Sequence, residues 1–236
     1  MRVTVIIPCR GGSEGVKKKN IAKLAGVPLL DYTVTHAKRS NLVDTIVVST
    51  EDAEIKAVAQ SLDVVVIDRP DDLAHADVMP WEAVRHAAEM FHSDLFVELH
   101  TTYPFRTPEL IDRAIETLSG ADCVMVGSRI YDRVFRKAPG GGFYRLAPDM
   151  EIKRRQEMEP LYRDHYGLVN VYTPRCRLEG NPYQSTMELC LTDDARCTFD
   201  IDTPEDMETA EKMIGEFFAS FVADDDLIRH HIPCGL

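Results

Sequence analysis

The first 130 residues alternate short apolar runs with amphipathic segments, and this alternation restricts the fold more than any other feature. β-Branched apolar residues dominate the runs, which predict buried strands at 3–8, 45–50, 63–68, 95–100 and 122–128. The segments between them predict helices at 29–40, 51–62, 80–91 and 107–118. Strands that are apolar throughout and alternate with helices predict an α/β fold, a mostly parallel sheet with helices on both faces.

The alternation of predicted strands and helices ends after the fifth predicted strand, 122–128. Residues 129–165 include the turn-rich stretch "APGGGFYRLAPD" and predict a hairpin-like lobe inserted in a single domain of residues 1–220. Strands are expected again at 166–173 and 196–202, followed by a helix at 203–218. Thr107 and Thr203 each precede a proline and are expected to be helix N-caps. Residues 221–236 are expected to form a peripheral tail.

Composition limits the partners. The 236 residues carry a formal net charge of −12, which argues against nucleic acid and anionic membranes. No apolar stretch reaches the length of a membrane-spanning helix, and "VTVIIP" is too short for a signal peptide. The six cysteines have neither C-x-x-C nor zinc-site spacing, so reduced, mostly buried thiols in a cytoplasmic protein are expected. Among them, Cys9 is expected to pack beneath a loop rather than react.

Basic residues nevertheless gather in two islands, residues 10–23 and 129–155. Two positive islands in an acidic chain indicate a small anionic substrate, although each island alone is equally compatible with solvated surface. The first island contains "PCRGGSEGVKKKN", where Gly11 and Gly12 would let backbone N–H groups approach phosphate oxygens. Arg10 adds a forked donor and Lys19 a mobile charge. The spacing matches neither the Walker A nor the G-x-G-x-x-G pattern, and a plain tight turn fits nearly as well.

Several motifs in fixed order carry a family resemblance. "IIPCRGGSEGVKKKN", "VVSTED", "RPDDLA", "PFRTPELID", "KRRQEMEPLY" and "FDIDTPEDM" span residues 3 to about 218. Together they resemble the sugar-acid cytidylyltransferases, the CMP-sialic acid synthetase group. The resemblance implies a Rossmann-like nucleotidyltransferase fold with a protruding dimerisation lobe, and hence a homodimer. It also implies transfer of CMP from CTP to the anomeric hydroxyl of a sialic-acid-like or related ulosonic acid, with release of pyrophosphate, for surface polysaccharide biosynthesis.

The resemblance also implies site residues. Those expected to bind the nucleotide are Arg10, Gly11, Gly12, Ser13, Lys19, Asn20 and Arg69. The segment "ELHTTYPFRT" resembles the family's LQPTSPLRT, which places His100, Thr102, Tyr103 and Arg106 at the sugar. The chain departs from that motif with His100 for glutamine, Thr101 for proline and Tyr103 for serine. It also has Glu14 where the family loop usually has lysine.

Two later motifs complete the expected site. Asp200 and Asp202 in "FDIDTPED" lie two apart on a predicted strand, so their carboxylates should share a face and suit Mg2+. The resemblance assigns them that role and makes Arg10, Lys19 and Asp202 the expected catalytic residues; a structural aspartate pair is the alternative. "KRRQEMEPLYRDHYGLVNVY" resembles RQxxPxxYxxNGAIY and adds Arg155, Gln156 and Tyr172 to the sugar side. An arginine there suits a substrate carboxylate, or forms surface ion pairs only.

Other functions remain open at this stage. The same fold serves nucleotidyltransferases that use another nucleotide or a sugar 1-phosphate, and glycosyltransferases that bind metal through a D-x-D motif. A catalytically weak dimeric protein that binds sugar nucleotides is a further alternative, which the altered segment 100–103 permits. Retention of Arg10, Lys19 and both aspartates argues against it.

Overall fold

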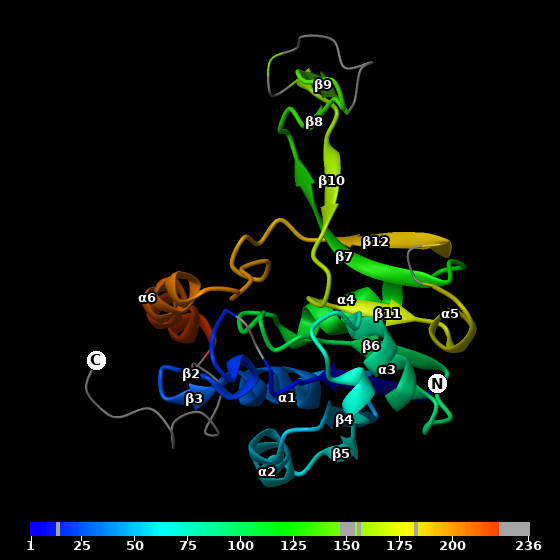
Figure 1. Ribbon diagram of the computed structural model, residues 1–236, viewed down its shortest axis with the longest axis vertical. Coiled ribbons are helices and arrows are strands. Elements are labelled where there is room, and N and C mark those ends of the chain that lie inside the picture. The colour runs from blue at the N-terminus through cyan, green and yellow to red at the C-terminus, as the bar shows by residue number, and fades with distance from the viewer. Residues whose placement is uncertain (13–14, 147–153, 155–156, 182–183, 222–236) are drawn as a thin grey trace.

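The computed structural model describes residues 1–221 apart from 13–14, 147–153, 155–156 and 182–183, with the side chains of 215–221 also left out. Its main sheet has the strand order β10-β7-β11-β6-β1-β4-β5, with β12 paired to β7 (Figure 1). The bounds are β1 (Val3–Pro8), β4 (Thr45–Thr50), β5 (Val65–Asp68), β6 (Leu95–Glu98), β7 (Cys123–Ile130), β10 (Leu161–Asp164), β11 (Asn170–Tyr172) and β12 (Met187–Leu191).

The sheet is mixed but mostly parallel. β1 pairs in parallel with β4 and β6, β4 with β5, and β7 with β12. β11 lies antiparallel between β6 and β7, and β10 is antiparallel to β7. The predicted α/β class with a mostly parallel sheet is therefore confirmed, and the antiparallel strands follow the excursion of the chain into the lobe.

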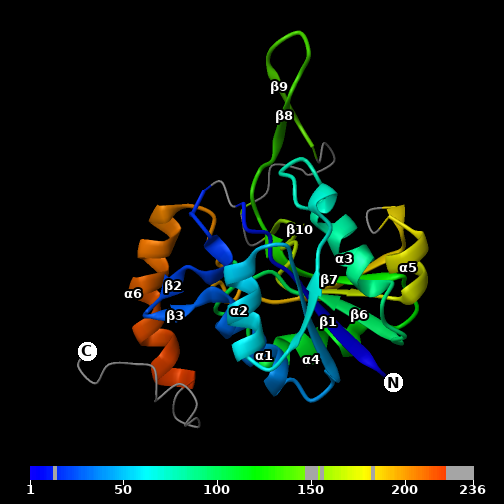
Figure 2. The ribbon, with the colours of Figure 1, turned by 60° about the horizontal axis from the view of Figure 1, so that its bottom comes forward.

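Helices cover both faces of this sheet (Figure 2). Alternate residues of β1 point to opposite faces, as a strand requires. Val5 packs in the cluster that includes α1 (Leu29–Arg39), α2 (Ala53–Ser61) and α4 (Pro108–Thr117). Ile6 packs in the cluster that includes α3 (Pro80–Ala88), which contacts α5 (Pro174–Glu179). The continuous apolar character of β1 thus comes from burial on both sides.

Local capping fixes where the helices begin. Thr107 accepts a hydrogen bond from Leu110 N, with Pro108 in the first turn of α4, as predicted. Thr203 and Asp206 cap α6 (Pro204–Phe221) reciprocally: Thr203 Oγ1 accepts from Asp206 N at 3.2 Å, and Asp206 Oδ2 accepts from Thr203 N at 2.8 Å. These caps hold because each side chain satisfies N–H groups that the helix leaves without a partner.

A smaller cluster lies beside the main core. α6 packs next to the short hairpin of β2 (Lys23–Leu24) and β3 (Val27–Pro28), as Figures 1 and 2 both show. Leu24, Phe105 and Ile201 are buried there. The cluster matters for function because it holds the segment before α6 against the loop after β6.

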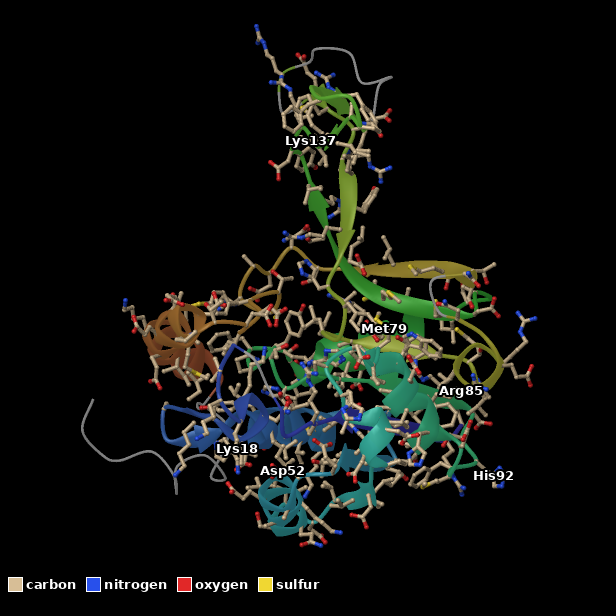
Figure 3. The ribbon with its side chains drawn as sticks, viewed as in Figure 1. Lys18, Asp52, Met79, Arg85, His92 and Lys137 are labelled. Carbon is tan, nitrogen blue, oxygen red and sulfur yellow. The ribbon has the colours of Figure 1, made fainter. Side chains whose placement is uncertain are left out.

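β8 (Phe135–Lys137), β9 (Phe143–Arg145) and the outer parts of β7 and β10 project from the body (Figure 1). β7 and β10 run antiparallel into this projection, and β8 pairs with β9 as a separate two-stranded sheet. Lys137 lies far out on this arm (Figure 3). We call β8, β9 and the outer parts of β7 and β10 the arm.

Two expectations were wrong. Residues 196–202 form no strand: Ile201 N donates to Thr102 O at 2.9 Å, but no ladder follows. The place beside β7 belongs to β12, which the sequence reading missed along with α5. The expected strand 166–173 shortens to β11, because residues 165–168 turn first. An alternating pattern shows that a segment suits a sheet and cannot show that a partner edge is available.

Two 3-10 helices, η1 (Lys19–Ile21) and η2 (Asp71–Leu73), lie in loops that follow β1 and β5. Within the described ranges, every helix is too short or too polar to cross a lipid bilayer.

Candidate active site

A cavity of about 790 Å3 lies where loops following several strands of the sheet converge. Ligands of open α/β sheets bind at this edge, beyond the carboxyl ends of the parallel strands. We call Arg10, Gly15, Lys19, Asn20 and Arg69 the basic wall of the cavity; all five line it. We call His100, Tyr103, His165 and Tyr166 the aromatic wall, which also lines it.

A third part of the lining comes from the stretch after β5 and the start of α3. Leu73, Val78, Met79, Pro80 and Ala83 contribute its apolar surface. Met79, labelled in Figure 3, directly precedes α3. Thr102, Asp200 and Asp202 also belong to the polar lining. The volume is in the range of pockets that hold small molecules.

Two glycines of the basic loop, Gly11 and Gly15, are approached closely by other residues, whereas a Cβ on Gly12 would meet nothing within 4 Å. A Cβ on Gly15 would lie 2.2 Å from the backbone oxygen of Asp202, so this loop can meet the segment before α6 only with glycine there. A Cβ on Gly11 would lie 2.6 Å from Asp52 Oδ2, and Gly11 N donates to Glu51 Oε1 at 2.6 Å. Gly15 lines the cavity, whereas Gly11 and Gly12 do not. Figure 3 labels Asp52 and Lys18, whose Nζ lies 4.0 Å from Asp52 Oδ2.

Asn20 joins two loops. Its Nδ2 donates to Arg10 O at 2.8 Å, and its Oδ1 accepts from Thr101 Oγ1 at 2.7 Å. The loops after β1 and β6 are therefore tied together beneath the cavity. Because Asn20 is buried, both bonds are shielded from competing water.

Arg69 is held rigidly at the cavity edge. It is buried and donates to Ser49 O at 2.7 Å and Ser49 Oγ at 3.3 Å, with Glu51 Oε2 at 3.9 Å. Burial, the largest influence, lowers the pKa of Arg69. Burial also raises the pKa of the neighbouring Cys9 to about 12, so Cys9 remains a thiol that packs, as expected.

The basic loop meets the two aspartates directly. Lys19 Nζ lies 2.8 Å from Asp202 Oδ1, and the Asp202 side chain is 67% exposed. Asp200 is half-buried, and its Oδ1 has no hydrogen-bond partner among the described residues. Burial raises the pKa of Asp200, with a further push from Asp202, against hydrogen bonds from Thr102 and Tyr103. The two carboxylates meet at this cavity from a loop rather than from the predicted strand.

Asp200 and Asp202 fit Mg2+ as a pair of ligands that leaves the other coordination positions to water and substrate. No group of three or more His, Cys, Asp or Glu side chains that could hold a metal ion occurs in the described part of the chain. A pair of carboxylates with one unsatisfied buried oxygen suits an ion that takes its other ligands from water and substrate phosphates. The donor set therefore fits a magnesium ion shared with a polyphosphate.

Of the expected sugar residues, His100, Thr102 and Tyr103 line the cavity. Arg106 and Tyr172 are fully buried and do not, so the expectation that they contact a sugar directly is wrong in this structure. Arg106 donates to the carbonyl oxygens of Leu168, His100 (2.7 Å) and Gly167 (3.1 Å). It holds the loop after β6 against the turn before β11.

Tyr172 likewise lies under the cavity. Its hydroxyl donates to Glu98 Oε2 at 3.1 Å, and the Arg177 guanidinium lies over its ring at 4.8 Å from the centroid. Both Tyr172 and Arg106 position other residues. Ser13, Arg155 and Gln156 lie outside the described residues.

Sequence reasoning missed several lining or supporting residues. Gly15 and Thr101 stood inside recognised motifs but were assigned no role. Arg163 lines the cavity from β10. Glu98 is fully buried in β6, and its signal was a charged residue inside the apolar run "LFVELH".

Comparisons with known proteins agree with this geometry. A family model described as Cytidylyltransferase matches residues 4–219. CMP-N,N'-diacetyllegionaminic acid synthase of Legionella pneumophila is 31% identical over 229 residues, covering 91% of this chain and 97% of the relative. 3-Deoxy-manno-octulosonate cytidylyltransferase of Anaeromyxobacter sp. is 27% identical over 239 residues, covering 90% of this chain and 97% of the relative.

Two further matches differ in the share of the matched protein that they cover. N-acylneuraminate cytidylyltransferase of Escherichia coli is 32% identical over 132 residues, covering 54% of this chain and 32% of the relative, so the match spans about a third of that relative. A solved structure of CMP:2-keto-3-deoxy-manno-octonic acid synthetase complexed with CTP superposes with a TM-score of 0.69 at 13% identity, covering 92% of this chain and 99% of the other. At that identity the superposition shows the fold alone.

Proposed function

Because this chain belongs to the cytidylyltransferase family of nucleotidyltransferase enzymes, we propose that it transfers CMP from CTP to the anomeric hydroxyl of an acidic sugar and releases pyrophosphate. The relatives named above carry sialic, legionaminic and octulosonic acids in their names, which supports a sugar acid as acceptor. The observation that carries the proposal is the 2.8 Å contact of Lys19 with Asp202. It joins the basic loop to the acidic pair at one cavity.

The basic wall holds the triphosphate. Arg10 offers a forked donor and Lys19 a mobile charge to phosphate oxygens. Arg69 is already fixed by Ser49, so it binds the nucleotide without further loss of side-chain entropy. Lys19 leaves Asp202 when it pairs with phosphate, which frees that carboxylate.

Asp200 and Asp202 hold Mg2+, the cofactor of this proposal. When bound, the ion neutralises charge on the triphosphate. The anomeric oxygen attacks the α-phosphorus, the bond from that phosphorus to the bridging oxygen breaks, and pyrophosphate leaves with the bonding electron pair. Asp202, the more exposed of the two carboxylates, accepts the proton of the attacking hydroxyl. Beyond this, the chain aligns its substrates and stabilises charge.

The acidic sugar lies along the aromatic wall, with Thr102 beside it. Arg163 lines the same cavity and is a candidate partner for the substrate carboxylate. Arg155 and Gln156 keep their proposed sugar role on the family resemblance.

The arm makes a homodimer in this proposal. Phe143 and Phe135 are 72% and 52% exposed, and Tyr144, Leu146 and Tyr162 are exposed as well. A run of exposed large apolar side chains on a projecting hairpin indicates an interface. Sedimentation velocity at micromolar concentration should show a dimer, which Phe143→Ser with Tyr144→Ser dissociates. A monomeric wild type would contradict the dimer.

We place the reaction in the cytoplasm. Cys9, Cys123, Cys176, Cys190 and Cys197 are buried thiols, and none forms a disulfide. This fits a reducing compartment.

The decisive experiment is a pyrophosphate-release screen. Four nucleoside triphosphates are tested with Mg2+ against nonulosonic and octulosonic acids, and against sugar 1-phosphates. Release with CTP and a sugar acid supports the proposal. Release only with a sugar 1-phosphate, or with none of the acceptors, would refute it.

A further inference from the structure

Glu98 is a fully buried carboxylate in β6, next to the aromatic wall, for which the proposed reaction has no use. Its Oε1 lies 2.8 Å from His100 Nε2 and accepts from the Tyr166 hydroxyl at 2.9 Å. Its Oε2 accepts from the Tyr172 hydroxyl at 3.1 Å and lies 3.6 Å from the Arg177 guanidinium. Five side chains from two distant stretches of chain, 98–100 and 166–177, therefore meet in one hydrogen-bonded network.

The network keeps Glu98 ionised. Burial by itself raises the pKa of Glu98, but the hydrogen bond and charge of His100, the charge of Arg177 and the Tyr166 hydroxyl together bring it below its ordinary value. An ionised carboxylate can only accept hydrogen bonds. His100 must therefore carry a proton on Nε2, whatever its charge, because Nε2 faces Oε1.

The imidazole ring of His100 has little freedom. A Cβ on Gly167 would lie 2.3 Å from its Cγ, and the Tyr166 ring meets it edge-on at 5.2 Å. His100 N also donates to Gly167 O at 2.8 Å. Gly167 has φ +85°, a conformation that favours glycine, so the turn itself supports the ring.

The second nitrogen of this ring is the one left for a ligand. His100 lines the cavity, and within the described ranges its Nδ1 has no hydrogen-bond partner. Because Nε2 carries the proton that Glu98 accepts, a neutral ring has its lone pair on Nδ1. The family motif has glutamine at this position, whose amide both donates and accepts. A neutral His100 in this tautomer only accepts.

We propose that Glu98 is a positioning residue that fixes the His100 ring with Nδ1 presented to the acidic sugar, and that this pair determines which sugar acid the protein uses. The inference rests on the proposed function. The chemistry it selects is a polar group on the sugar, such as a hydroxyl or an amide, placed to hydrogen-bond with Nδ1 beside the aromatic wall.

A purely structural role is the competing explanation. Glu98 and Arg177 form a buried ion pair, and Arg177 also donates to the carbonyl oxygen of Trp81 at the start of α3. In that case Glu98 would matter for stability in the same way whether or not His100 is present. A double-mutant cycle separates the two roles.

The cycle uses Glu98→Gln, His100→Phe and the double variant, assayed by pyrophosphate release with saturating CTP. Each single substitution is expected to raise KM for the sugar acid about tenfold, which is the effect of losing one hydrogen bond. The values of kcat and of KM for CTP should stay within about twofold of the wild type. The double variant should be no worse than His100→Phe. Additive losses, or a fall in kcat with an unchanged sugar KM, would overturn the proposal.

Glu188→Gln is the matched control. Glu188 is a carboxylate of β12 that accepts from Ser119 N at 2.9 Å and Ser119 Oγ at 2.7 Å and does not line the cavity. Its sugar KM should equal that of the wild type. Sugar analogues lacking one hydroxyl or the amide group identify the sugar group that contacts Nδ1: the analogue without it should lose about tenfold in affinity with wild type and nothing with His100→Phe.

One readout does not depend on activity. In 15N-histidine spectra of the wild-type protein, assigned by the loss of the signal in His100→Phe, His100 should be protonated on Nε2 with Nδ1 unprotonated when neutral. The Nδ1-protonated tautomer would overturn the role of Glu98. If no sugar acid supports pyrophosphate release, the proposed function fails, while this tautomer measurement still decides the positioning role.

Discussion

The two walls of the cavity are built in opposite ways. The basic wall comes mostly from one stretch, residues 10–20, and its key contact, Lys19 to Asp202, lies at an exposed carboxylate. The aromatic wall rests on side chains that are completely buried, Glu98, Arg106, Tyr172 and Arg177, which come from different parts of the chain. The basic wall places Lys19 at an exposed carboxylate, and the aromatic wall presents side chains that buried residues support from beneath.

In the proposed function, the basic wall recognises phosphate and the aromatic wall recognises the sugar, and this division accounts for the difference. Phosphate oxygens accept bonds from many directions, so a flexible cation and a glycine-rich backbone suffice. Discrimination between sugars requires single donors and acceptors at fixed positions, because only a misplaced or missing partner lowers the affinity of the wrong sugar. Changes in the basic wall should therefore alter turnover and CTP affinity. Changes beneath the aromatic wall should alter stability and the choice of sugar.

The largest effect is expected for Asp202→Asn. Loss of the carboxylate removes a ligand for Mg2+ and the acceptor for the sugar proton, and turnover at saturating CTP and Mg2+ should fall about 100- to 1,000-fold. Glu205→Gln, an exposed carboxylate in the first turn of α6, should retain wild-type turnover. Unfolding curves of both variants should match the wild type. Unchanged pyrophosphate release by Asp202→Asn would remove this residue from the mechanism.

The second-largest effect on activity is expected for Lys19→Ala. Removing the cation that pairs with phosphate is expected to lower kcat/KM for CTP about 100-fold, with the KM for the sugar acid much less affected. Lys17→Ala removes the same charge from an exposed neighbour that does not line the cavity, and should change kcat/KM less than about twofold. Equal losses in the two variants would mean that the loop acts only through its overall charge.

Arg106→Lys tests the buried support of the aromatic wall. A lysine cannot serve three carbonyl oxygens with the geometry of a guanidinium, so the free energy of unfolding should fall by about 2–3 kcal/mol. Arg113→Lys is the comparison, because Arg113 makes one exposed bond, to Leu191 O at 3.2 Å, and should lose less than about 0.5 kcal/mol. Denaturant titration measures both. A fully stable Arg106→Lys would show that the aromatic wall does not depend on this residue.

The smallest expected effect is a gain in thermal stability, for Asp200→Asn. The pKa of Asp200 is raised by burial, so the folded protein binds that proton more tightly than the unfolded chain does. Stability is then lost as pH rises from the ordinary pKa of aspartate through the raised one, and at neutral pH the Asp200 charge is destabilising. Asp200→Asn should therefore melt at a higher temperature than the wild type in EDTA at pH 7.5, although the proposed mechanism predicts that it loses activity.

The same difference in melting temperature should shrink as the pH is lowered towards 4, because the wild type then gains its proton. Thermal unfolding followed by circular dichroism checks both points. A lower melting temperature for Asp200→Asn at neutral pH would contradict the assigned cause of the shift.

The fold was largely predictable, for identifiable reasons. The runs at β1, β4 and β6 are mostly apolar because both faces are covered, and Thr107 with Pro108 marked the start of α4. The predicted strand at 196–202 was wrong because Ile201 alternates with polar neighbours yet packs in a separate cluster against α6. Hydrophobic alternation reports burial, and it cannot report whether the buried neighbour is a strand or a helix.

The sequence alone determined the residues whose chemistry is local: the basic loop around Arg10 and Lys19, and the aspartate pair two residues apart. Only the tertiary structure decided that Lys19 reaches Asp202, 183 residues away, that Gly15 is needed for that approach, and that Arg106 and Tyr172 lie beneath the site. It also decided that Glu98, inside an apolar strand, faces His100. Charge and spacing are properties of a segment, whereas burial and the partner of a polar group depend on which distant segments pack together.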